Sequence, residues 1–195
     1  MTTSPTAVAD LIDTVASLYL APPSDTDISL VDRAAQAADT IDGVTDLPAE
    51  QRSTFQAAFA LAVVTAAAAA RVSQEVLDRR RVFWQGNADT TRDDIQIQKL
   101  IGELAAVAYG AKASVAAAAA DLTDPEASAA AYLVAQSAAD LVTARLFDAL
   151  GSSASKVSAA LNFYWLTART IAAPQPVPEL AATLGARVLG VSARP

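Results

Sequence analysis

The segment LNFYWLTARTIAAPQP, from Leu161 to Pro176, gathers residues that could hold an anionic ligand. Arg169 lies between small residues and next to Thr170, and its guanidinium is a permanent cation whose planar fork suits phosphate and carboxylate groups. A second candidate is Gly151-Ser152-Ser153, where a helix is expected to begin and free backbone amides attract phosphate oxygens. Ser152, Ser153 and Arg169 are therefore candidate ligand-binding residues.

Each of these residues also has a purely structural interpretation. The aromatic residues 163–165 are of the types that fill a core or pack a helix end. Arg169 could cap the C-terminal end of its helix, or pair with Asp148 or Glu179. Glycine and serine at 151–153 equally suit an ordinary junction between two helices. The residue types alone leave both interpretations open.

The composition excludes several kinds of chemistry. The 195 residues include no histidine and no cysteine, which removes zinc sites, a Ser-His-Asp triad and a thiolate nucleophile. Asp89, Asp93 and Asp94 suit loop and cap positions, with a magnesium site as the alternative. The net charge of −7 argues against nucleic acid and anionic membranes as partners.

Nothing at the N-terminus has the pattern of a targeting segment. The first residues lack a basic leader, and Asp10 and Asp13 interrupt the apolar stretch. The uncharged run 53–70 falls short of the roughly 20 residues that span a bilayer, and its alanines are weakly hydrophobic. We therefore expect a cytoplasmic protein with no membrane partner.

Alanine dominates the sequence, and few glycines or prolines interrupt it, which predicts long helices. Proline pairs, acidic residues before proline, and Gly151-Ser152-Ser153 mark where these helices begin and end. At 46–48, Asp46 is expected to cap the helix that follows. The expected helices run from residue 4 to 21, 27–41, 48–81, 94–122, 125–150, 154–172 and 179–189. Four of them are long and joined by short connections, which predicts an all-α, up-and-down four-helix bundle.

Several motifs resemble the C-terminal helical domain of the acyl-CoA dehydrogenase superfamily, in its branch of flavin-dependent monooxygenases typified by dibenzothiophene monooxygenase. The segment DIQIQKLIGELAA is similar to a DPxVQxxLGELAA segment of that branch, and FDALGSSASKVSAALNFYWLTARTIAAPQPVPELAATLGARVLG is similar to its GGASA…LDRHWRNART…HDP…LG…LG pattern. The matching positions in the second segment include Gly151, Trp165, Arg169 and Thr170. The resemblance covers residues 55–190 at matching spacings.

This resemblance implies a domain division and a cofactor. Residues 1–48 are expected to be an N-terminal helical extension, 49–190 the bundle, and 191–195 a tail. The implied cofactor is FAD or FMN, shared with a partner chain, in a homo-oligomer or a hetero-oligomer with a flavoenzyme subunit. The expected contacts are Gln98, Ser152, Ser153, Arg169 and Thr170, together with Arg80 and Phe83, which resemble a corner that reaches the dinucleotide of a neighbouring subunit. Arg80 equally suits a solvated helix end.

The sequence departs from the family at the positions that handle protons. Pro174 stands where the branch has histidine, and Ala168 lies near the position of the glutamate base of the acyl-CoA dehydrogenases. Neither side chain can transfer a proton, so no catalytic residue is expected. Nothing in the sequence predicts the middle β-domain of the family. The expected function is therefore that of a subunit or accessory half of a flavin-dependent oxidoreductase, not catalytic alone. The alternative is a non-catalytic bundle for oligomerisation or partner binding.

Overall fold

The computed structural model describes residues 3–20, 29–79, 88–150 and 154–191. Every regular element in these ranges is a helix, which confirms the all-α prediction. The α-helices are α1 (Pro5–Ser17), α2 (Leu30–Ala38), α3 (Ala49–Asp78), α4 (Ile95–Ala120), α5 (Pro125–Arg145), α6 (Ala154–Ala172) and α7 (Val177–Val188). Two short 3-10 helices, η1 (Val44–Asp46) and η2 (Thr91–Asp93), precede α3 and α4.

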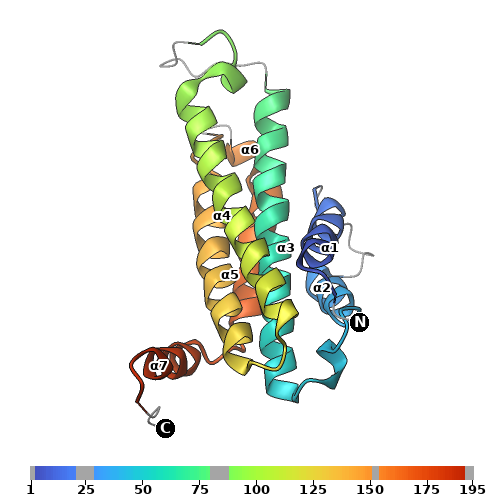
Figure 1. The fold of residues 1–195 in the computed structure, drawn as a ribbon. Coiled ribbons are helices and arrows are strands. Elements are labelled where there is room, and N and C mark those ends of the chain that lie inside the picture. The colour runs from blue at the N-terminus through green and yellow to red at the C-terminus, as the bar shows by residue number, and fades with distance from the viewer. Residues whose placement is uncertain (1–2, 21–28, 80–87, 151–153, 192–195) are drawn as a thin grey trace.

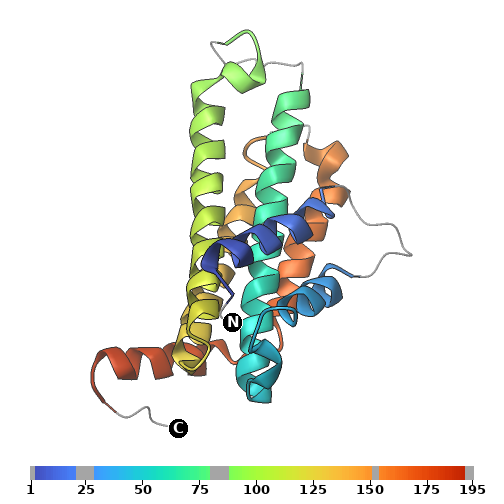
Figure 2. The same cartoon turned by 45° about the vertical axis from the view of Figure 1, so that its right-hand side comes forward.

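Helices α3 to α6 run alternately up and down and form the bundle, as Figure 1 shows. The shorter helices α1 and α2 lie across one side of α3, and α7 leaves the foot of the bundle beside the start of α5 (Figure 2). The packed bundle is the predicted one, and the extra N-terminal helices are present.

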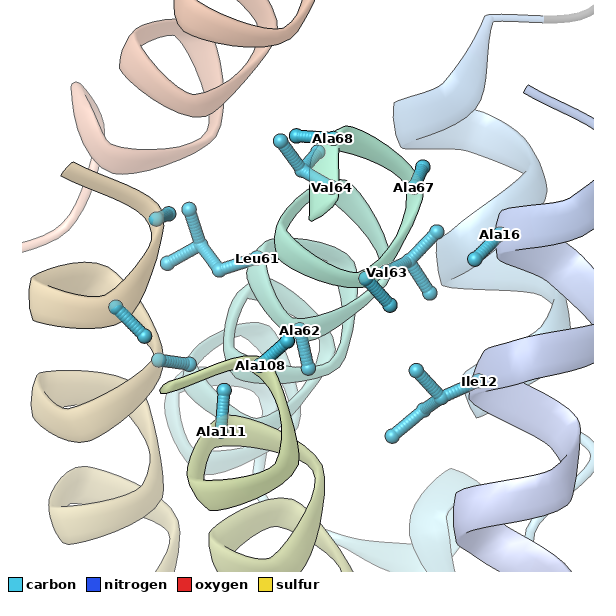
Figure 3. Close-up of a cluster of buried hydrophobic side chains, with 14 of the residues drawn as sticks. Ile12, Ala16, Leu61, Ala62, Val63, Val64, Ala67, Ala68, Ala108 and Ala111 are labelled. Atoms are coloured by element: carbon cyan, nitrogen blue, oxygen red, sulfur yellow. The ribbon is translucent and has the colours of Figure 1, made fainter. Parts of the chain in front are cut away.

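Helix α3 is the centre of the core because it is buried on every side. Figure 3 shows that Leu61 points toward α5, Ala62 toward Ala108 and Ala111 of α4, and Val63 toward α1. Successive helical positions are rotated by about 100°, so three consecutive residues reach three different neighbours. Alanine at the α3–α4 crossing allows the two backbones to approach closely, while the larger side chains fill the space toward α5 and α1.

Polar contacts fasten the N-terminal helices to the bundle. Asp39, which follows α2, accepts hydrogen bonds from Nε and Nη2 of Arg52 at 3.0 and 2.6 Å and from Gln56 Nε2 at 2.7 Å. The hydrogen bonds from Arg52 are the main reason that the pKa of Asp39 lies below its ordinary value. Farther along α3, Arg71 Nη1 donates to the carbonyl oxygen of Leu20, which follows α1, at 2.9 Å.

These helices also share their core with the bundle. Val8, Ile12 and Leu30 are fully buried and belong to the same hydrophobic cluster as the side chains of α3 to α6. The division of the chain at residue 48 into an extension and a bundle stays a prediction.

Most helices begin and end near the residues that the sequence predicted to cap or interrupt them. Ser4 caps α1 by accepting from the Ala7 amide at 3.2 Å, and Asp94 and Asp124 cap α4 and α5 by accepting from amides two residues later. The predicted aspartate cap of α3 is wrong. Asp46 lies inside η1, and the residue before α3 is Pro48, which makes no side-chain cap.

Other predicted helix ends need correction. Helix α5 ends at Arg145 rather than at residue 150, because residues 146–150 form turns that bury Leu146 and Leu150. Helix α3 ends at Asp78, three residues earlier than predicted. The described part of the second helix ends at Ala38, and the chain then turns through Gly43, whose φ of 86° is a left-handed conformation that favours glycine.

Two helices are long and apolar enough to cross a membrane by length and composition alone. They are α3 and α4. The most apolar stretch of α3 is 72% buried inside the molecule, and that of α4 is 33% buried. Helix α3 is mostly buried, as a core helix of a bundle is. A core helix can be as long and as apolar as a membrane-spanning helix.

Candidate functional site

The outward side of α6 carries the predicted ligand-binding residues of that helix. Asn162, Trp165, Leu166, Arg169 and Thr170 are all exposed and recur every three or four residues, so they share one side of the helix, which we call the α6 outer face. Two large apolar side chains therefore lie in solvent beside a cation and a hydroxyl.

Arg169 is held by two contacts that leave it accessible. Its Nη2 lies 3.5 Å from Asp140 Oδ1 of α5, and its guanidinium carbon lies 5.6 Å from the centre of the Trp165 ring. The predicted ion-pair partners were wrong, since neither Asp148 nor Glu179 fills that role. More than half of the Arg169 side-chain surface stays exposed, so the guanidinium keeps donors for an incoming anion.

The aromatic run divides between the two sides of α6. Tyr164 is buried, and its hydroxyl donates to the Tyr19 carbonyl oxygen at 2.5 Å. Phe163 stacks near the Tyr19 ring with a centroid distance of 6.4 Å and meets Tyr164 edge-on at 5.4 Å. These two residues therefore pack the end of α1 against the bundle, and only Trp165 of the three faces outward with Arg169.

Burial changes the pKa of Tyr164, the tyrosine that faces inward. Desolvation raises the pKa of Tyr164 from its ordinary value of 10.0 to about 12, because the ionised phenol has little solvent around it. The phenol is protonated at neutral pH, as it would be at its ordinary pKa, and it donates a hydrogen bond to the backbone. It serves as a structural clamp and lies on the opposite side of α6 from Arg169.

The remaining positions of this segment offer no group that transfers protons. Thr170 donates its hydroxyl proton to the Leu166 carbonyl oxygen at 3.0 Å and keeps its lone pairs free to accept. Ala168 is buried against the bundle, and Pro174 lies in the turn after α6. The α6 outer face can thus bind and orient an anion, and it carries no acid or base for catalysis.

Gln98 lies on a different helix from Arg169 and its partner Asp140. It is exposed at the start of α4, and its Nε2 donates to the Arg92 carbonyl oxygen at 3.0 Å. It borders an apolar cavity of about 380 Å³ beside Ser73 and Val76 of α3. The segment after α6, by contrast, reaches the start of α3, where Gln175 contacts Ser53.

These contacts place Gln98 and Arg169 apart. Arg169 pairs with Asp140 of α5, which lies five residues before Arg145. Arg145 in turn pairs with Glu103 of α4, five residues after Gln98, so the Arg169 ion pair and Gln98 are about 15 Å apart along the bundle. The structure therefore does not bring Gln98 together with Arg169 and Thr170 within one chain. Arg80, Phe83, Ser152 and Ser153, the other predicted ligand-binding residues, lie outside the described residues.

The predicted alternative of a magnesium site is not supported by the described residues. Among them, no three acidic, histidine or cysteine side chains come together as a metal site. Asp93 instead accepts a hydrogen bond from the Thr90 hydroxyl at 2.5 Å, and Asp94 caps α4. Both carboxylates have the loop and cap roles that their positions indicate.

Sequence reasoning missed some of the residues that shape the site. Asp140 is distant in sequence from Arg169, and only the packing of α5 against α6 brings them together. The contact of Arg169 with Trp165 had a detectable signal, because residues four apart on a helix are neighbours. Leu166 was not singled out, although the same spacing places it on the exposed side.

No family model and no curated protein matches the sequence. Solved structures do match the fold. Methanesulfinate monooxygenase MsuC from Pseudomonas fluorescens is 21% identical with a TM-score of 0.67, and the match covers 74% of this chain and 41% of that one. Dibenzothiophene monooxygenase TdsC from Paenibacillus sp. A11-2 is 20% identical with a TM-score of 0.62, over 72% of this chain and 40% of that one. A complex of TdsC with FMN and indole matches with a TM-score of 0.64.

The matched part is about two-fifths of the length of these enzymes. It is helical and agrees with the C-terminal helical domain to which the sequence motifs pointed, so the resemblance is confirmed at the level of fold. At this sequence identity the similarity shows the fold alone, and the chemistry has to be argued from the residues of this chain. About three-quarters of this chain therefore has the fold of a helical part of the monooxygenases MsuC and TdsC.

Proposed function

We propose that this protein is an accessory helical subunit of a flavin-dependent oxidoreductase assembly, in which another polypeptide supplies the counterpart of the rest of the enzyme. The observation that carries the proposal is the α6 outer face. It exposes Trp165 and Leu166 beside Arg169, in a fold shared with part of such enzymes. By itself the chain catalyses no reaction.

The chemistry of the α6 outer face fits an anionic flavin held between two chains. FMN and FAD carry phosphate groups, and the guanidinium of Arg169 can donate paired hydrogen bonds to phosphate oxygens. Thr170 can accept a hydrogen bond at the same face, and the Trp165 and Leu166 side chains supply apolar area for a partner surface. When bound, the flavin supplies the redox chemistry, and the residues of this chain position it.

Gln98 belongs to a second contact in the same proposal. It lies on a different helix and about 15 Å along the bundle from the ion pair of Arg169, so it forms a contact separate from that of Arg169. In the assembly, Gln98 contacts the flavin of a neighbouring protomer, as Arg80 and Phe83 are expected to do. The assembly works in the cytoplasm and uses neither nucleic acid nor a membrane, in line with the net charge of −7.

The second candidate function is oligomerisation or partner binding without any flavin. It is favoured by Ala168 and Pro174, which replace the proton-handling groups of the family, and by the ion pair that already occupies Arg169. In that case the exposed residues of α6 dock a protein and the flavin is absent from the complex.

Replacing Arg169 with alanine is expected to weaken flavin retention roughly 10- to 100-fold, because a charge-assisted hydrogen bond contributes about 1.5–3 kcal/mol. The tagged chain is captured with its partner from the cells that make it, and the flavin absorbance of the complex is measured during dialysis. Arg145→Ala is the matched control, since it removes a surface arginine that pairs with Glu103 on α4.

The outcomes separate the two candidates. Flavin in the wild-type and Arg145→Ala complexes, together with its loss from the Arg169→Ala complex, supports the accessory role. If the Arg169→Ala complex retains flavin to the same extent as the wild-type complex, Arg169 does not bind the cofactor. Capture of a partner that carries no flavin supports the second candidate and rejects the first.

A further inference from the structure

Arg169 is held more loosely by its carboxylate partner than the other ion-paired arginines of the described residues are. Its Nη2 lies 3.5 Å from Asp140 Oδ1, whereas a charge-assisted hydrogen bond between such groups measures about 2.7–2.9 Å. Arg52 and Arg145 reach carboxylate oxygens at 2.6 and 2.8 Å. The carboxylate of Asp140 is therefore close enough to attract the guanidinium and too far away to hold it firmly.

Asp140 has little part in holding the fold together. Within the described residues, Arg169 is the one group that its carboxylate contacts. The buried phenol of Tyr132 is affected by the charge of Asp140, yet it has no hydrogen-bond partner in this part of the chain. The side chains of Asp140 and Arg169 are 42% and 58% exposed, and an exposed pair of this kind contributes little to stability. The effect of Asp140 is therefore expected on what binds Arg169.

Trp165 supports the guanidinium from its own helix. The guanidinium carbon lies 5.6 Å from the centre of the Trp165 ring, one turn earlier on α6. A cation–π contact uses none of the N–H donors of the guanidinium. When Arg169 leaves Asp140, Trp165 can therefore keep it on the α6 outer face while its donors turn to another acceptor.

We propose that Asp140 is a positioning residue that competes with the anionic ligand for Arg169. The inference rests on the proposed function, because the ligand in question is the phosphate of the flavin. Without flavin, Asp140 neutralises Arg169 and keeps it turned toward α5. When flavin binds, the guanidinium exchanges the 3.5 Å contact for paired hydrogen bonds to phosphate oxygens, which are shorter and stronger. The carboxylate of Asp140 is then left beside the phosphate and repels it.

Competition and repulsion both lower the affinity for a flavin that carries a phosphate. The phosphomonoester of FMN has a charge of roughly −1.5 to −2 at neutral pH, so a neighbouring carboxylate opposes it. Because Asp140 and Arg169 are both exposed, water and salt screen these charges, and the effect is several-fold in size. Asp140 thus makes the flavin easier to release than Arg169 alone would allow.

Asp140→Asn tests the competition, because asparagine has nearly the same shape as aspartate and carries no charge. The complex captured with this chain is stripped of flavin by dialysis and titrated with FMN. The Asp140→Asn complex is expected to bind FMN about 3- to 10-fold more tightly than the wild-type complex. The helical content and melting temperature of the chain are expected to stay unchanged, since the altered side chain is exposed and contacts Arg169 alone among the described residues.

Riboflavin separates an effect on the phosphate from an effect on the fold. It has the ring system of FMN without the phosphate, so its affinity is expected to be the same in the wild-type and Asp140→Asn complexes. Asp140→Glu keeps the carboxylate and is expected to bind FMN as the wild type does. Asp148→Asn is the matched control for net charge, since it removes another exposed carboxylate that pairs loosely with an arginine, Arg145, at 3.7 Å.

The Arg169→Ala chain shows whether Asp140 acts through Arg169. If the two groups compete, Asp140→Asn is expected to improve FMN binding less in the Arg169→Ala chain than in the wild type, since only the repulsion remains. An equal improvement in both chains would mean that the carboxylate acts on the phosphate directly, and it would overturn the competition.

Two further results overturn the inference and leave the proposed function in place. They are a wild-type complex that binds FMN as tightly as the Asp140→Asn complex does, and an Asp140→Asn complex in which riboflavin binding improves as much as FMN binding. A captured complex that binds neither flavin overturns both the inference and the proposed function.

Discussion

Replacing Phe59 with alanine is expected to lower the free energy of unfolding by about 3–5 kcal/mol. Phe59 is fully buried in α3, against which five other α-helices pack, so its removal leaves a cavity at the centre of the core. For a chain of this length, a loss of this size lowers the melting temperature by roughly 6–20 °C. Chemical denaturation followed by circular dichroism at the helical band measures both the free energy and its change.

Leu166→Ala is the matched control for this prediction. It also removes a large apolar side chain from a helix, at a position that is 56% exposed, and is expected to change the free energy of unfolding by less than about 0.5 kcal/mol. Equal losses in the two variants would mean that α3 is not the centre of the core. That result would contradict the fold described here.

The second prediction concerns alkaline pH and the buried Tyr164. Its pKa is raised from 10.0 to about 12 by burial, so the folded protein holds the phenolic proton more tightly than the unfolded chain does. The resulting stabilisation is fully present below pH 10. It is lost as the pH rises from 10 to 12, because the unfolded chain gives up its proton first. A shift of this size corresponds to about 2–3 kcal/mol.

Tyr164→Phe isolates this contribution. Below pH 10 the variant is expected to be less stable than the wild type by about 1–3 kcal/mol, because the Tyr19 carbonyl oxygen loses its donor. Between pH 10 and pH 12 the variant is expected to gain about 2–3 kcal/mol relative to the wild type, which closes or reverses the difference, since only the wild type has this proton to lose. Urea denaturation at a series of pH values measures the difference directly.

Two other tyrosines serve as internal references. Burial also raises the pKa of Tyr132, but this residue is present in both proteins and cancels in the difference. Tyr109→Phe removes a phenol that is largely exposed and is expected to follow the wild-type curve. A constant gap between wild type and Tyr164→Phe across pH 10–12 would show that the phenol is not desolvated in the folded state.

The sequence was informative about helices because helix formation depends on neighbouring residues. Alanine content, proline at helix starts and aspartate at 94 and 124 predicted where α4 and α5 begin. The errors arose where tertiary contacts override local preference. Residues 146–150 have helical propensity, yet Leu146 and Leu150 are buried in turns, since burying them in the core outweighs continuing the helix.

The candidate site was harder to predict because its geometry joins distant segments. The sequence singled out Arg169 and Thr170, and both lie on the exposed side of α6. It could not show that Asp140 is the ion-pair partner of Arg169, or that Tyr164 faces the other side to clamp Tyr19. Those facts depend on how α5 and α1 pack against α6.

By itself, the sequence determined that the chain is helical, that it has no histidine or cysteine for catalysis, and which residues of α6 could meet an anion. The tertiary structure alone decided that Arg169 pairs with Asp140 and that Gln98 lies on another helix, about 15 Å away along the bundle. The reason is physical. Helix propensity and side-chain chemistry belong to single residues and their near neighbours, whereas burial and separation are set by contacts between residues far apart in the chain.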